Sequence, residues 1–113
     1  MSELVQRLAK GSHPVTVGGP IPSVKDLKDQ IDRGYAHIKF TQTKGGTDLG
    51  VRLEMEACSI DKADFDKGTG KVHLEGTLTL DYVPVRCVAD IDLADLNGKG
   101  HLVIRKEEKK ESN

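Results

Sequence analysis

Apolar and polar residues alternate along most of the chain after residue 34, and this alternation predicts β-strands. Ile38 and Phe40 alternate with polar neighbours in residues 35–42, and the same pattern runs through residues 49–58 and 71–80. Successive side chains of a strand point to opposite faces, so one face of each predicted strand packs on a core and the other meets water. Further alternating segments at 83–93 and 101–105 complete the predicted sheet.

The apolar positions change phase by one residue between the segments 71–80 and 83–93. Val72 and Leu74 occupy even positions, whereas Val83 and Val85 occupy odd positions. A straight strand would turn its apolar face outward after such a change, so we predict a tight turn or a bulge at residues 81–84.

The spacing of apolar residues predicts a helix over about residues 23–33. Val24, Leu27 and Ile31 recur at helical intervals, and Gly34 follows as a stop signal. Ser23 is a suitable N-cap, with an acidic residue three positions later, as in a capping box.

The N-terminal part of the chain gives weaker signals. Residues 2–10 have the pattern of a short helix that begins at Ser2 and ends before Gly11. Residues 11–22 are rich in proline and glycine and predict a loop, with a short extended piece at 15–17.

Together these elements predict a single α+β domain over residues 1–105. Its main amphipathic helix, at about 23–33, packs on a four- to five-stranded antiparallel meander at about 35–105, and the short N-terminal helix is added to it. Residues 106–113 form a charged segment that we expect to be disordered.

Composition and charge narrow the range of functions. The chain has 113 residues, 17 basic and 18 acidic side chains, and only 4% aromatic residues. We therefore expect no nucleic-acid partner, because there is no excess of basic residues, and no membrane partner, because there is no long apolar run. The first residues do not resemble a secretory signal, and Cys58 and Cys87 occupy opposite strand phases, so we expect reduced thiols and a cytoplasmic location.

The polar face of the predicted sheet is the candidate binding face. The binding candidates on it are His37, Arg52, Glu54, His73, Glu75, Asp92 and His101, and the same face also carries Lys39, Glu56, Arg86 and Asp90. Such a face is typical of a solvated sheet surface with cross-strand pairs, and the alternative is a binding surface. If Asp81 paired with Pro84, then His73, Asp92 and His101 would form one row. The row lacks further nitrogen or sulfur ligands, so we predict no metal site.

A glycine-rich turn gives a candidate binding loop, and no motif predicts catalysis. The loop comprises Gly45, Gly46, Thr47 and Asp48, whose backbone N–H groups could face an anion, and the alternative is that the glycines serve only a hairpin turn. Cys58 has an exposed strand phase but no evident base beside it, and no known catalytic signature is present. We therefore assign no catalytic residues, expect no cofactor, and favour a protein that is not an enzyme.

The resulting hypothesis is a small non-catalytic binding or accessory module that acts through protein–protein contact. Its partner would be another protein or a second copy of the chain, bound at exposed edge strands. The main alternative is a small-molecule-binding protein or minor enzyme with an apolar pocket between the helix at 23–33 and the sheet. A third hypothesis is a metal-binding or proton-sensing role of His37, His73 and His101.

Overall fold

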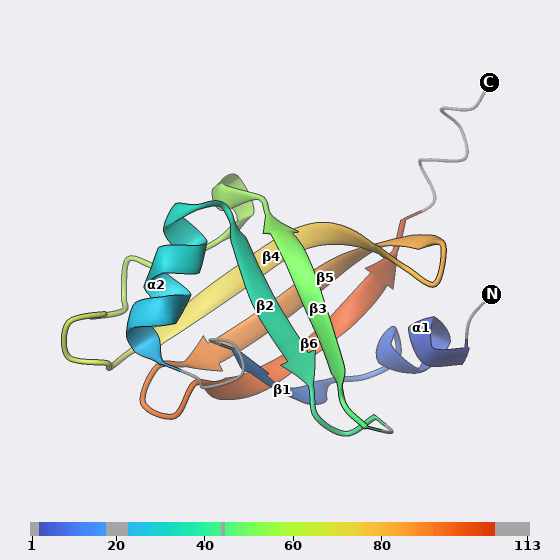
Figure 1. Cartoon of the computed structure of the whole chain (residues 1–113), viewed down its shortest axis with the longest axis horizontal. Helices are drawn as coiled ribbons and strands as arrows, with labels where there is room; N and C mark the ends of the chain where they lie inside the picture. Colours follow the sequence, from blue (N-terminus) through green and yellow to red (C-terminus); the bar gives the residue numbers. More distant parts are fainter. Residues whose placement is uncertain (1–2, 18–22, 44, 106–113) are drawn as a thin grey trace.

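The chain forms a closed antiparallel β-barrel. The computed structural model describes residues 3–17, 23–43 and 45–105. Its elements, in chain order, are α1 (Glu3–Leu8), β1 (His13–Val17), α2 (Val24–Asp32), β2 (Tyr35–Phe40), β3 (Thr47–Leu53), the 3₁₀ turn η1 (Met55–Ala57), β4 (Lys71–Leu80), β5 (Val83–Asp92) and β6 (Asn97–Ile104). The six strands are neighbours in chain order, and β1 closes the barrel by pairing with both β2 and β6. Figure 1 shows α2 at one end of the barrel and α1 near the other.

This architecture corrects the predicted helix on an open meander. The main difference is β1, which the sequence predicted only as a short extended piece within a loop. Val15 and Val17 point into the barrel, but β1 is only five residues long and contains Pro14. Its strand conformation comes from antiparallel pairing on both sides, a non-local effect that alternation within the segment does not reveal.

The helix at 23–33 is confirmed in position, although it covers one end of a barrel. The Ser23 side chain accepts a hydrogen bond from the backbone N–H of Asp26 at 3.0 Å, as expected for the N-cap. Leu27 and Ile31 are buried against the barrel core. The largest fully buried side chains of that core include Phe40, Leu8, Leu27, Ile31, Ile38, Leu74, Ile91, Leu93 and Leu102.

Several strand boundaries differ from the prediction, two of them by four residues or more, and the predicted turn is confirmed. The segment 49–58 forms a strand only as far as Leu53, after which η1 begins. The last strand starts at Asn97 instead of His101. Between β4 and β5, the ladder ends at the pair Leu80↔Val83, so the chain reverses in two residues.

Some predictions fall on parts of the chain outside the described residues. These are the helix start at Ser2, the second part of the loop at 18–22 and the charged segment 106–113. Within the described residues, neither helix has the length and apolarity needed to cross a membrane.

Candidate functional site

The barrel is closed by very few pairs between β3 and β4. Their ladder contains only Arg52↔Thr77 and Leu53↔Gly76, whereas β4 and β5 pair continuously from Lys71 to Leu80 on β4. Figure 1 shows β3 and the β4–β5 hairpin diverging from this short contact. The first part of β3 therefore has a strand neighbour on one side only, among the residues that the structure describes.

The backbone of β3 presents hydrogen-bonding groups to this divergence. The N–H of Leu53 donates to Gly34 O at 2.9 Å, on the β2 side, whereas the N–H of Glu54 donates to Glu75 O at 2.9 Å, on the β4 side. Backbone groups of an antiparallel strand alternate between its two sides. The N–H and C=O groups of Asp48 and Gly50 consequently face away from β2. Residues 47–51 are called the β3 edge below.

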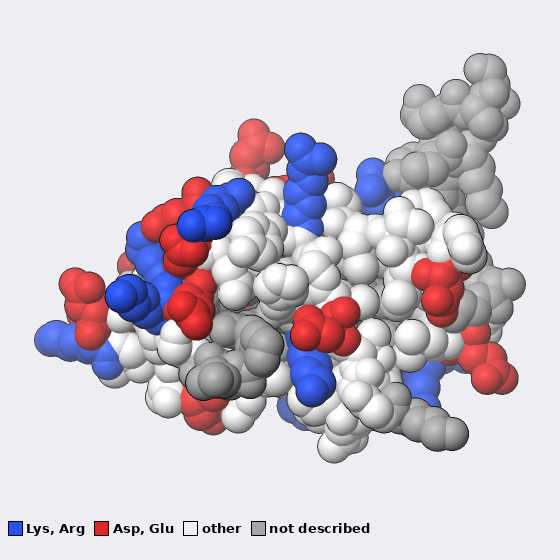
Figure 2. All heavy atoms as spheres, in the orientation of Figure 1, with Lys and Arg blue, Asp and Glu red and all other residues white. Residues whose placement is uncertain are grey.

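Apolar side chains become accessible where β3 stops covering the hairpin. Leu74 on β4 is fully buried (0% exposed), but Leu78 and Leu80, which follow on the same face, are only half-buried. Val83 on β5 is also half-buried. These last three residues are called the hairpin patch, and the β3 edge and the hairpin patch together are called the open seam. Figure 2 shows charged side chains gathered over α2, whereas the surface between β3 and the hairpin is mostly uncharged.

A shallow pocket lies beside the β3 edge. It has a volume of about 300 Å³ and is lined by Glu3, Leu4, Arg7, Thr43 and Thr47. The pocket thus joins α1 to the β2–β3 turn, next to the first residue of β3. It extends the open seam by a concave surface with both polar and apolar lining groups.

The predicted binding loop adjoins the open seam. Gly45 and Gly46 have φ values of 74° and 76°, in the left-handed region that favours glycine, and they lie in the β2–β3 turn. Thr47 and Asp48 already belong to β3, so this half of the predicted loop is strand. The loop is therefore partly a turn and partly the β3 edge, and its glycines shape the turn.

On the outer face of the barrel, five charged residues form a network that links three segments. His73 contacts Glu75 through Nε2 at 2.6 Å and Asp90 through Nδ1 at 2.7 Å. Arg86 donates to Glu75 at 3.0 Å and also pairs with Glu54. Hydrogen bonds to Glu75 and then Asp90 raise the pKa of His73, while the bond to His73 is the main cause that lowers the pKa of Glu75. These charges are satisfied by one another, as expected for side chains that hold β4 and β5 in register.

The predicted row of His73, Asp92 and His101 does not exist. His73 lies opposite Asp90, and Asp92 lies opposite Lys71, because the two-residue turn makes Leu80 pair with Val83. The prediction had assumed a pair between Asp81 and Pro84, which displaces the partner of each β4 residue by two positions. His101 is opposite Val88. In the described part of the chain, no group of three or more His, Cys, Asp or Glu side chains could hold a metal ion.

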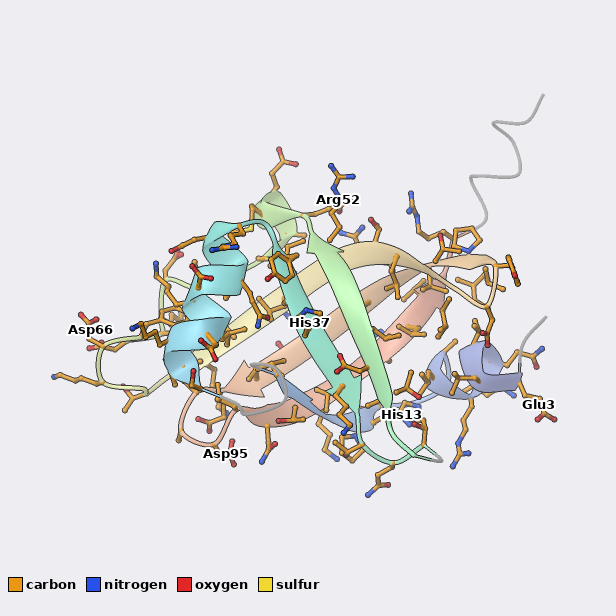
Figure 3. The ribbon with its side chains drawn as sticks, in the orientation of Figure 1. Glu3, His13, His37, Arg52, Asp66 and Asp95 are labelled. Atoms are coloured by element: carbon orange, nitrogen blue, oxygen red, sulfur yellow. The ribbon has the colours of Figure 1, made fainter. Side chains whose placement is uncertain are left out.

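The remaining residues of the predicted face lie apart from the charged network. His37 is exposed on β2, with its Nδ1 3.7 Å from a carboxylate oxygen of Asp48. Figure 3 shows His37 and Arg52 on β2 and β3, away from Asp66 and Asp95 in the turns at the other end. Of the seven binding candidates on the predicted face, only Glu54, His73 and Glu75 come together, joined by Arg86 and Asp90 of the same predicted face.

Neither cysteine has the environment of a nucleophile. Cys58 is half-buried, and its Sγ accepts a hydrogen bond from the N–H of Glu75 at 3.4 Å. Burial is the main cause that raises the pKa of Cys58, and burial raises the pKa of Cys87 to about 12. Both groups therefore stay protonated near neutral pH, whereas attack requires the thiolate.

A second pocket lies beside α2, on the outside of the barrel. It has a volume of about 400 Å³ and is lined by Val24, Lys25, Lys28, Phe65 and Asp66. The Phe65 ring lies 6.0 Å from the Lys28 ammonium. This pocket differs from the predicted apolar pocket between helix and sheet, because Leu27 and Ile31 fill the inner side of α2.

Most residues of the open seam were not predicted as site residues from the sequence. The predicted loop includes the start of the β3 edge, but Gly50, Leu78, Leu80 and Val83 were assigned only to strands. Their accessibility depends on where β3 and β4 part, which local alternation does not encode. Gly76, a glycine within a regular strand, was the available signal of a close backbone approach.

Comparison with known families gives a match that covers most of the chain. Residues 25–113 match the family model described as core binding factor beta subunit, and this region runs from α2 through β2 to β6. The family consists of small non-catalytic subunits that bind partner proteins. A search of curated proteins gives no match to the chain. The match identifies the chain as a protein-binding accessory module.

Proposed function

The chain belongs to the core binding factor beta subunit family, and from that membership we propose that it is the accessory subunit of a complex with a different protein, which it binds at the open seam. The observation that supports this site is the β3 edge, where the backbone groups of Asp48 and Gly50 face away from β2 without a described strand beside them. An extended segment of a partner can add to such an edge through main-chain hydrogen bonds.

The hairpin patch supplies the apolar part of the proposed interface. Protein interfaces combine a buried apolar centre with polar contacts around it. Leu78, Leu80 and Val83 would form that centre, while the β3 edge and the side chains of the nearby pocket would supply polar contacts. The partner is thus a protein with an extended segment and an apolar surface beside it.

The closed barrel limits where strand addition could occur. Several described strands pair with one neighbour over only part of their length: β3 lacks a second neighbour over residues 47–51, β4 meets β3 only at Gly76 and Thr77, and residues 101–104 of β6 lie beyond its ladder with β1. Among these stretches we assign strand addition to the β3 edge, because the hairpin patch lies beside it. The balanced charge of the chain agrees with a subunit that does not itself bind nucleic acid. We also keep the cytoplasmic location as a prediction.

The experiment uses a matched pair of variants at Gly50. Its φ is not in the left-handed region, and a Cβ added there would meet only His37 Cε1 at 3.9 Å. Gly50→Pro removes the N–H that faces the seam, a change that an edge position tolerates, and its ring hinders an added strand. Gly50→Ala keeps the N–H and is the control.

The full chain and both variants are immobilised and exposed to an extract of the source organism, and the captured proteins are quantified. We expect one protein to be captured in near-stoichiometric amount by the natural chain and by Gly50→Ala, and to be depleted at least about tenfold with Gly50→Pro. Calorimetric titration with that purified protein then gives the Kd. Equal retention by both variants, with similar melting temperatures, would refute binding at the β3 edge, and capture of no such protein would refute the proposed function.

A further inference from the structure

Tyr82 lies in the two-residue turn between β4 and β5 and projects into solvent. Its exposed fraction is 99%, compared with 46% for Met55 and 45% for Val103, the other large apolar side chains exposed among the described residues. A tyrosine ring with this exposure makes almost no contact within the chain. The fold therefore gains nothing from burial of this side chain.

The backbone of Tyr82 is strained. Asp81 and Tyr82 have φ values of 52° and 67°, so both central residues of the turn are in the left-handed region. Turns of this type favour asparagine or aspartate followed by glycine, because a large side chain at positive φ crowds its own backbone. A residue that is costly for the fold and unused by it suggests selection for contact with another molecule.

The turn lies at the margin of the open seam. Leu80 and Val83, the last pair of the β4–β5 ladder, flank the turn and belong to the hairpin patch. A partner segment that covers the hairpin patch would therefore come within reach of Tyr82. The surface between β3 and the hairpin is mostly uncharged, which suits an apolar partner surface (Figure 2).

We propose that Tyr82 is the anchor of the interface and inserts into an apolar pocket of the partner protein. Tyrosine suits this role because its ring is large and rigid and its hydroxyl can bond to a polar group inside the pocket. Such aromatic side chains commonly dominate the binding free energy of an interface. This inference rests on the proposed function and adds a requirement to it: the partner carries an apolar pocket next to the segment that meets the β3 edge.

The test combines partner affinity with stability of the free chain. Tyr82→Gly removes the ring and relieves the strained backbone, so we expect a higher melting temperature of the free chain together with a Kd for the purified partner that rises at least about 30-fold. Tyr82→Phe keeps the ring and should hold the Kd within about tenfold of the natural value. Opposite effects of Tyr82→Gly on stability and on binding are the signature of an anchor.

A spectroscopic readout follows from the absence of tryptophan in the chain. Tyr82→Trp introduces a single indole, whose emission should shift to shorter wavelength when the partner is added and should become protected from quenching by acrylamide. An unshifted, fully quenchable indole in the complex would overturn the proposal.

The variants at Gly50 and Tyr82 separate the two proposals. Loss of binding with Gly50→Pro but an unchanged Kd with Tyr82→Gly would overturn the anchor and leave the proposed function intact. Loss with Tyr82→Gly alone would support the anchor and refute strand addition at the β3 edge. If no partner is captured by the natural chain, both proposals fail.

Discussion

Gly76 decides whether β3 and β4 can meet, and replacing it should open the barrel at the seam. A Cβ at this position would lie 2.2 Å from Arg52 O, 2.6 Å from Val51 Cγ1 and 2.8 Å from Arg52 C. These distances are about 1 Å or more shorter than ordinary van der Waals contact. Two of the three atoms belong to the backbone of β3, so β3 must move as a strand for Gly76→Ala to fit.

The expected cost follows from crowding and from lost pairing. Crowding of a close-packed site costs about 1–3 kcal/mol, and each lost backbone hydrogen bond costs about 1 kcal/mol. Because the β3–β4 ladder has only the pairs Arg52↔Thr77 and Leu53↔Gly76, a shift of β3 disturbs all of it. We expect Gly76→Ala to lower the free energy of unfolding by about 2–4 kcal/mol. At about 4 °C per kcal/mol for a domain of this size, the melting temperature should fall by about 8–16 °C.

Gly50→Ala is the matched control, because both glycines lie in strands without positive φ. The nearest atom to a Cβ at Gly50 is His37 Cε1, at 3.9 Å, so this variant should be neutral or more stable by up to about 1 kcal/mol. Urea and thermal unfolding, followed by circular dichroism, measure both variants. Equal stability of the two variants would refute the reasoning.

Hydrogen exchange shows where Gly76→Ala acts. The N–H of Glu54 bonds to Glu75 O across the seam, whereas the N–H of Leu53 bonds to Gly34 O on the other side. Opening of the seam should speed exchange at Glu54 more than at Leu53. Equal acceleration at both amides would indicate general destabilisation instead of local opening.

Two other substitutions test the charged network and a buried amide. The raised pKa of His73, caused first by Glu75 and then by Asp90, means that protonation favours the folded state. The stabilisation from protonated His73 is complete below the pKa of the unfolded chain, about 6.5, and is lost as the pH rises through the pKa of the folded chain. The stability difference between the natural chain and His73→Gln should therefore shrink from pH 6 to pH 9. A constant difference in urea unfolding would contradict this. Gln30 is 8% exposed and its Oε1 accepts from the N–H of His37 at 3.0 Å. Gln30→Leu should cost about 1–3 kcal/mol in the same assay, and a loss below about 0.5 kcal/mol would show that this bond is dispensable.

The sequence predicts elements whose signals are local. Ser23 and the spacing of Leu27 and Ile31 were sufficient for α2, because capping and helical periodicity depend only on neighbouring residues. Alternation was sufficient for β2, β4 and β5 for the same reason. The sequence predicted only part of β1, because five residues are too few for a clear alternating pattern and the strand is stabilised by its pairing with β2 and β6. Closure of the barrel depends on this pairing.

The register of the β4–β5 hairpin was wrong because its turn lacks the usual sequence signal. Asparagine–glycine or aspartate–glycine would have predicted a two-residue turn. Here Tyr82 occupies the glycine position, and this conflict between side chain and backbone left the length of the predicted turn, and hence the register, undetermined. For this reason the sequence predicted Asp92 opposite His73, whereas the structure has Asp90 there. Sequence reasoning therefore failed at the position that we propose for partner binding, as expected where function overrides local preference.

The open seam also raises the question of why the chain would not pair with itself. Exposed edges are templates for uncontrolled association, and proteins limit this risk with short edges and charged side chains. The β3 edge spans only residues 47–51 and carries the exposed Asp48, and the ladder at Arg52 and Leu53 stops an added strand from extending along β3. Two copies paired through this short edge would gain few hydrogen bonds. A partner that also fills the hairpin patch and receives Tyr82 would gain much more, so the geometry favours a heterologous complex over a dimer of the chain.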